Sequence, residues 1–132
     1  MAPGGRGMGV TKTILIIDDD PDIRSALRIV LEAAGFSVGE ASSGAEGLAA
    51  AGRVEPDAVI VDLMMETVDA GSRMSQELKA RGFSGPIYLL SSAGESVRFN
   101  IDARELGLAG IFQKPLDHGV LVRTLKKTLR VE

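Results

Sequence analysis

Five short apolar runs mark the chain, and segments with a helical period separate them. The runs lie at residues 13–17, 36–40, 57–62, 86–90 and 110–113. Between them apolar residues recur every three or four positions, and one such segment places Ile23, Leu27 and Leu31 on one face. This repetition of strand and helix predicts a doubly wound α/β fold, with a five-stranded parallel sheet covered by helices on both faces.

The ends of the predicted helices carry local signals. Asp20 can accept a hydrogen bond from the first helical turn, and Pro21 suits the first helical position, so the first helix is predicted to begin there. Four glycines occur where a helical pattern stops: Gly35, Gly52, Gly82 and Gly107. Each is predicted to end a helix, because glycine readily adopts the left-handed backbone conformation.

Composition excludes several classes of protein and site. The chain has no cysteine, which rules out disulfides and thiolate metal sites and suits a reducing cytoplasm. No apolar run approaches the roughly 18 residues of a membrane span. The net charge of −3 disfavours a nucleic-acid partner, because contacts with phosphates need a basic surface.

The chain length of 132 residues fits one domain with a short leader. Residues 1–11 are rich in glycine and contain no apolar stretch, which excludes a secretory signal peptide. We therefore expect a flexible leader over residues 1–11 and a single cytoplasmic domain over residues 12–132.

Polar side chains stand at the carboxyl ends of four predicted strands. Asp18 and Asp19 follow the first strand, and Asp62 ends the third. Ser91 follows the fourth strand, and Lys114 follows the fifth. Because ligands of parallel sheets bind beyond the carboxyl ends of the strands, we expect these side chains to converge at one edge.

Three carboxylates, a hydroxyl and an ammonium group suit phosphoryl transfer. Carboxylate oxygens are the hard ligands that Mg²⁺ prefers, and one or two of them usually hold the ion. A carboxylate beside the metal can act as a nucleophile toward phosphorus. Ser91 can donate a hydrogen bond to the transferred group, and Lys114 supplies a compact positive charge.

Each of these residues also has a structural alternative. Asp18 and Asp19 could be capping acids, and Asp62 could merely end a strand before a turn. Ser91 could bond the local backbone, and Lys114 could be an ordinary surface lysine. Spacing along the sequence leaves these alternatives open.

The ordered set of motifs resembles the receiver domain of response regulators in bacterial two-component systems, over about residues 12–130. The matching pieces are the acidic pair in ILIIDDD, the aspartate in VIVDLMM, the hydroxyl in LLSSA and the KP pair after the fifth strand. Each piece alone is weak, but their order and their positions at strand ends make the set specific. The resemblance implies a flavodoxin-like (βα)5 fold with strand order 2-1-3-4-5.

The resemblance also implies roles for the acidic residues. Asp62 would be the phosphoacceptor, and the donor would be a histidine kinase or a phosphotransfer protein. Asp19 and Asp62 would ligate Mg²⁺ directly and Asp18 through water, while the main-chain carbonyl of Met64 would complete the protein ligands. Such a domain catalyses only its own phosphorylation and dephosphorylation, so it is not expected to be an enzyme for other substrates.

A further implication concerns the output of the domain. Ser91 and Lys114 would meet the phosphoryl group, and the Lys114–Pro115 bond would be cis, as is typical of the family. The face formed by the fourth helix, the fifth strand and the fifth helix would bind a downstream protein. Because the last helix ends the chain, we expect a stand-alone domain, unless the sequence is a piece of a longer regulator. We expect a monomer or weak dimer without nucleic-acid or membrane contacts.

Two features depart from the family pattern. Glu66 occupies a position where receivers usually carry proline, and Gly71 comes one residue later than usual, so the loop after the third strand is altered. Ile111 stands three residues before Lys114, where many receivers carry an aromatic residue that switches. Phe112 cannot replace it, because adjacent strand residues point to opposite faces.

Two other functions compete with a phosphorylated receiver. A pseudo-receiver would keep the fold but bind partners without phosphate, and the complete acidic set argues against it. A phosphatase of the haloacid dehalogenase type would carry its nucleophile in D-x-D-x-T on the first strand. Here residues 18–22 read DDDPD, without the threonine, and the chain has no room for a cap domain.

Overall fold

The computed structural model describes residues 11–63, 65, 70–92, 94–95, 104 and 107–131. Within them five strands pair in parallel: β2 (Thr13–Ile17), β3 (Ser37–Ala41), β4 (Ala58–Asp62), β5 (Ile87–Ser91) and β6 (Gly110–Gln113). Their order in the sheet is β3-β2-β4-β5-β6, which is 2-1-3-4-5 when the strands are counted along the chain. The predicted fold class and strand order are confirmed. The expected leader lies almost entirely outside the described residues.

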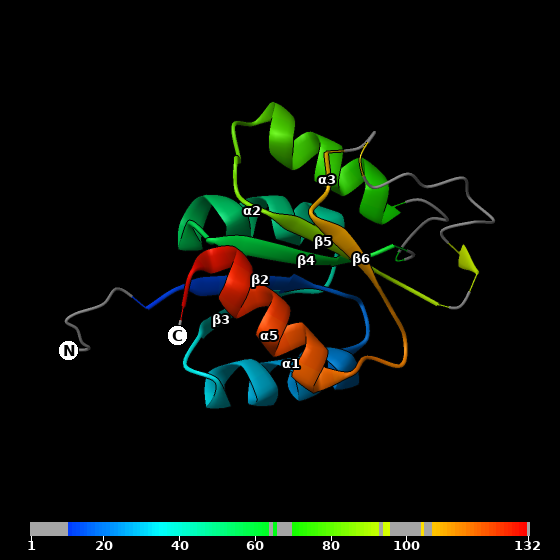
Figure 1. The fold of residues 1–132 in the computed structure, drawn as a ribbon. Helices are drawn as coiled ribbons and strands as arrows, with labels where there is room; N and C mark the ends of the chain where they lie inside the picture. The colour runs from blue at the N-terminus through cyan, green and yellow to red at the C-terminus, as the bar shows by residue number, and fades with distance from the viewer. Residues whose placement is uncertain are drawn as a thin grey trace.

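Helices cover both faces of the sheet (Figure 1). The helices of the described residues are α1 (Pro21–Ala33), α2 (Gly44–Val54), α3 (Ala70–Ala80) and α5 (His118–Leu129). α1 and α5 lie on one face, and α2 and α3 lie on the other (Figure 1). None of these helices is long and apolar enough to cross a membrane.

Each face of the sheet has its own apolar cluster, because successive strand residues point to opposite sides. On β4, Val59 and Val61 pack toward α2 and α3, while Ile60 packs toward α1 and α5. On β6, Ile111 packs against the first cluster and Phe112 against the second, so the predicted separation of these two side chains is confirmed.

The start of α1 follows its sequence signal. The Asp20 carboxylate accepts a hydrogen bond from the Asp22 N–H at 2.9 Å, and Pro21 occupies the first helical position. After the helix, Gly35 adopts a φ of +99°, which favours glycine. Both ends of α1 therefore lie where the local signals predict them.

The predicted end of α2 at Gly52 is wrong. Gly52 lies inside the helix, which continues to Val54, and Glu55 then takes the left-handed conformation with φ 49°. Pro56 explains this end, because the residue before a proline is disfavoured in helical conformation. A second, smaller difference from the prediction concerns Ser91, which is the last residue of β5 and not the first residue after it.

Gly47 and Gly52, both on α2, offer a matched test of how this helix packs on the sheet. A Cβ atom at Gly47 would lie 2.6 Å from Ile17 Cδ1 and 2.8 Å from Met74 Cε, whereas one at Gly52 would meet nothing within 4 Å. Changes to alanine gain similar helix propensity at both sites. Ile17 Cδ1 and Met74 Cε are the ends of side chains that are buried and can move only a little, so we expect Gly47→Ala to be less stable than Gly52→Ala by about 1 kcal/mol, the lower end of the usual cost of overpacking. Urea unfolding gives both free energies, and equal values would contradict this close approach of α2 to β2.

Candidate functional site

The carboxyl ends of β2 and β4 bring three carboxylates together. Asp18 directly follows β2, and Asp62 is the last residue of the neighbouring strand β4. One oxygen from each of Asp18, Asp19 and Asp62 lies within 4.8 Å of the others. Asp18 is fully buried and Asp62 is 5% exposed, whereas Asp19 faces solvent. The cluster thus joins two buried acids to one that solvent reaches.

Asp18 is held by the groups around it. Its N–H donates to the Ala41 carbonyl at 3.1 Å, and its Oδ1 accepts from the Asp20 N–H at 2.9 Å. Its own carbonyl accepts from the Arg24 guanidinium at 2.6 Å. The second carboxylate oxygen, Oδ2, is buried and has no hydrogen-bond partner in the described part of the chain. Because a buried charged oxygen without a hydrogen bond is costly, and its ion-pair partner Lys114 Nζ is 3.8 Å away, this atom points to a further ligand that the protein itself does not supply.

Lys114 reaches the carboxylates from the loop after β6. Its Nζ donates to Asp62 Oδ1 at 3.1 Å and lies 3.8 Å from Asp18 Oδ2. Its main-chain N–H donates to the Ser91 carbonyl at 2.7 Å, and the Lys114–Pro115 bond is cis. A lysine that bonds a buried carboxylate is not an ordinary surface lysine, so that structural alternative fails.

Ser91 lies beside the cluster but is not joined to it. Its Oγ is fully buried and has no hydrogen-bond partner among the described residues. Within the described part of the chain, the hydroxyl therefore bonds neither the backbone nor Asp62 or Lys114. The sequence predicted that five side chains meet at one edge of the sheet. The structure joins four of them in one charged cluster, namely Asp18, Asp19, Asp62 and Lys114, and leaves the Ser91 hydroxyl without a bond to it.

Burial raises the pKa of both buried acids. Burial is the main cause that raises the pKa of Asp62 to about 6; the charge of Asp18 adds to it, and the bond from Lys114 opposes it. Burial also raises the pKa of Asp18, against the hydrogen bond from the Asp20 main chain. Burial is the largest single influence on the pKa of Lys114 and acts to lower it, but the bond to Asp62 and the negative charges of Asp62, Asp18 and Glu95 together raise the pKa above its usual value.

The donor set fits Mg²⁺. When all groups are ionised, three carboxylates against one ammonium leave two negative charges uncompensated, which is the charge that a divalent cation neutralises. The donors are hard oxygens, and the unpartnered Oδ2 of Asp18 is among them. The Met64 carbonyl, the other expected ligand, lies outside the described residues, as does Glu66. Gly71 lies in the first turn of α3.

Sequence reasoning missed Arg24. In the sequence it is one of several charged residues on an amphipathic helix, and no motif marks it. Only the fold brings its guanidinium to the Asp18 carbonyl and to Glu40 on β3.

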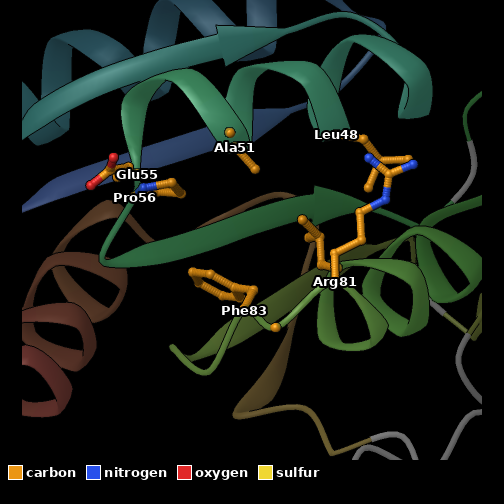
Figure 2. A pocket seen from close by; sticks show the side chains of 9 residues that line it. Leu48, Ala51, Glu55, Pro56, Arg81 and Phe83 are labelled. Atoms are coloured by element: carbon orange, nitrogen blue, oxygen red, sulfur yellow. The ribbon is translucent and has the colours of Figure 1, made fainter.

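A hollow of about 360 Å³ between α2 and α3 is not part of this site (Figure 2). Its lining is mostly apolar and includes Leu78 and Phe83, with Glu55 and Arg81 toward its ends (Figure 2). Phe83 precedes β5 and Glu55 precedes β4, so the hollow lies at the amino ends of the strands, opposite the carboxylates.

The comparisons with known proteins agree on one family. The family model described as the response regulator receiver domain matches residues 14–126. The chain is 34% identical over 119 residues to the DNA-binding dual master transcriptional regulator RpaA of Synechocystis sp., covering 89% of this chain and 48% of RpaA. It is 33% identical over 116 residues to the transcriptional regulatory protein GlrR of Escherichia coli, covering 88% of this chain and 26% of GlrR. The chain thus spans half or less of the length of these relatives.

Solved structures agree on the fold. A response regulator receiver domain protein from Clostridium thermocellum superposes with a TM-score of 0.81 at 26% identity, covering 90% of this chain and 94% of that one. The chemotaxis protein CheY4 of Vibrio cholerae superposes with a TM-score of 0.79 at 26% identity, covering 90% and 99%.

Asp62→Asn tests the repulsion within the cluster. Asparagine keeps the shape of the side chain but removes the charge that burial and Asp18 disfavour. In the folded protein the pKa of Asp62 is about 6, above its ordinary value of 3.8. Ionisation of this carboxyl therefore lowers the free energy of unfolding as the pH rises between these two values. Without Mg²⁺ near neutral pH, we expect Asp62→Asn to raise the free energy of unfolding by about 1–3 kcal/mol, and this gain to vanish below about pH 4.

Chemical denaturation of both proteins across this pH range, in the presence of a chelator, gives the difference directly. A variant that is less stable than the wild type at neutral pH would mean that the bond to Lys114 outweighs the repulsion, against the raised pKa.

Proposed function

The chain belongs to the response regulator receiver domain family, and on that basis we propose that it accepts a phosphoryl group on Asp62 in the presence of Mg²⁺. One observation carries the proposal. Asp62 is a buried carboxylate that bonds Lys114 at 3.1 Å and shares its surroundings with two further acids. Neither a capping role nor a simple strand end accounts for that combination.

The transfer uses Asp62 as the nucleophile. A carboxylate oxygen of Asp62 forms a bond to phosphorus while the bond from phosphorus to the donor breaks, and the donor leaves with that electron pair. With a phosphohistidine of a kinase or phosphotransfer protein as donor, the leaving group is the imidazole. The domain catalyses its own phosphorylation and dephosphorylation and acts on no other substrate.

Three acids and one main-chain carbonyl would hold the metal. Asp19 and Asp62 are proposed as direct ligands, Asp18 as a ligand through water, and the Met64 carbonyl as the last protein ligand. Bound Mg²⁺ would neutralise the negative charge that an anionic phosphoryl group meets at this cluster. The burial of Asp18 and its three bonds to protein groups support its role as a fixed partner of the ion.

Ser91 and Lys114 are the proposed contacts of the phosphoryl group. Lys114 is already beside the acceptor, and its ammonium can donate to a phosphoryl oxygen as well as to Asp62. The buried Ser91 hydroxyl lacks a partner, and a phosphoryl oxygen would satisfy it.

The output is proposed to pass to a separate protein through the face that includes β6 and α5. The fourth helix, which is expected from the sequence to complete this face, falls mostly on residues outside the described ones. The name of RpaA describes DNA binding for a protein about twice as long as the region matched here, so DNA binding is not carried over. A receiver domain over residues 12–132, a leader over residues 1–11, a cytoplasmic location and a monomer or weak dimer remain parts of this proposal.

Phosphorylation by a small donor tests the acceptor. With Mg²⁺ and acetyl phosphate, the wild type should gain the mass of one phosphoryl group, and Asp62→Asn should gain none because an amide is not a nucleophile of this kind. Asp22→Asn is the control, since Asp22 is an exposed acid on α1 that should not affect labelling. Intact-mass spectrometry measures all three proteins. Full labelling of Asp62→Asn would place the acceptor elsewhere, and an unlabelled wild type would favour the pseudo-receiver.

A second test separates the neighbouring acids. Asp19→Ala removes a proposed ligand and should weaken Mg²⁺ binding sharply. Asp20→Ala removes only the carboxylate that caps α1 through the Asp22 N–H, so it should leave Mg²⁺ affinity nearly intact and cost about 1 kcal/mol of stability. Calorimetric Mg²⁺ titration and thermal unfolding give both quantities. Equal loss of Mg²⁺ binding in the two variants would contradict this division of roles.

A further inference from the structure

Arg24 contacts the main chain that carries the acid pair. It lies one turn into α1, and its side chain is only 17% exposed. Its Nη1 donates to the Asp18 carbonyl at 2.6 Å, and its Nε donates to Glu40 Oε1 at 3.0 Å. That carbonyl belongs to the peptide that joins Asp18 to Asp19, so the guanidinium fixes the link between the two acids.

This contact completes the restraint of Asp18. The N–H, the carbonyl and Oδ1 of Asp18 each bond to a protein group, and Oδ2 is the atom left for the cluster with Asp62. A ligand held in this way has lost its conformational freedom before a metal binds. Such support from residues behind the ligands commonly raises metal affinity.

We infer that Arg24 is a positioning residue of the cation site and sets the affinity for a divalent cation through the Asp18–Asp19 peptide. The inference rests on the proposed function, because it takes these two acids as the metal-binding pair. Glu40 on β3 in turn holds the guanidinium.

The same network contains a matched control. Arg28 lies one turn after Arg24 and also bonds Glu40, together with Glu32 and the Val38 carbonyl. None of these bonds reaches Asp18. A change at Arg28 therefore removes an equal charge and perturbs the contact of α1 with β3, but it leaves the peptide of the acid pair in place.

The sign of the effect separates positioning from charge. Arg24 is a cation near a proposed cation site, so by Coulomb's law its removal alone would strengthen Mg²⁺ binding. Loss of a positioning bond would weaken it instead. The two explanations thus predict opposite changes in the same measured quantity.

The experiment is a calorimetric Mg²⁺ titration of the unphosphorylated protein. Arg24→Gln should raise the Kd about tenfold, a typical result for a residue that supports a metal ligand. Arg24→Lys should also raise it, although the charge is kept, because an ammonium lacks the planar fork that joins two acceptors. Arg28→Gln should leave the Kd nearly unchanged. At saturating Mg²⁺, phosphorylation of Arg24→Gln by acetyl phosphate should return to nearly the wild-type rate.

The outcomes distinguish this inference from the proposed function. If the wild type binds Mg²⁺ and both Arg24 variants bind it equally well or more tightly, the positioning role is overturned and the proposed function stands. Equal weakening in Arg28→Gln overturns it too, because the effect would then belong to the contact of α1 with β3. A wild type that binds no Mg²⁺ overturns both. If Arg24→Gln does not unfold cooperatively, Arg24→Lys decides by the same comparison.

Discussion

The hydrogen bond between Lys114 and Asp62 holds together a site whose own charges would push it apart. Two buried carboxylates and one exposed carboxylate share a region in which an oxygen of each lies within 4.8 Å of the others. The lysine compensates only partly, because the pKa of Asp62 stays raised to about 6 in spite of the bond. A cation at the cluster would favour the ionised carboxylate and so keep Asp62 available as a nucleophile at neutral pH. The same excess of negative charge that acts against the stability of the protein without a metal would therefore favour the binding of a cation.

The sheet explains why these acids meet. Ile16 on β2 pairs with Ile60 on β4, and both pack toward α1 and α5. Asp18 and Asp62 each come two residues later, so they continue the same row beyond the apolar cluster. Parallel strands bring all such positions to one edge, and the carboxyl end of the apolar core becomes the start of the charged cluster.

Features set by a few neighbouring residues could be predicted from the sequence, and features set by distant contacts could not. The cap at Asp20 and Pro21 and the five strands follow from local pattern, and both agree with the structure. The end of α2 was misplaced because Gly52 is compatible with a helix interior, while Pro56 was the stronger stop signal.

At the site, too, some contacts could be predicted from the sequence and others could not. The convergence of Asp18, Asp62 and Lys114 could be predicted, because the topology of a parallel sheet fixes where strand ends lie. The role of Arg24 could not be predicted, since its partner is a main-chain carbonyl and carbonyls carry no sequence signal. The unattached hydroxyl of Ser91 depends on rotamer and backbone details that spacing does not encode.

The position of Ile111 limits how the proposed signal could leave the site. Its side chain packs toward α2 and α3 and has no polar atom, so it can form no hydrogen bond with Ser91. On the other face, Tyr88 contacts Phe112 with ring centroids 5.1 Å apart and bonds Thr128 of α5 at 2.8 Å. Tyr88 and Ser91 belong to the same strand, β5. A displacement of the end of β5 toward Asp62 would therefore reach α5 through the strand itself and through Tyr88, without an aromatic switch at position 111.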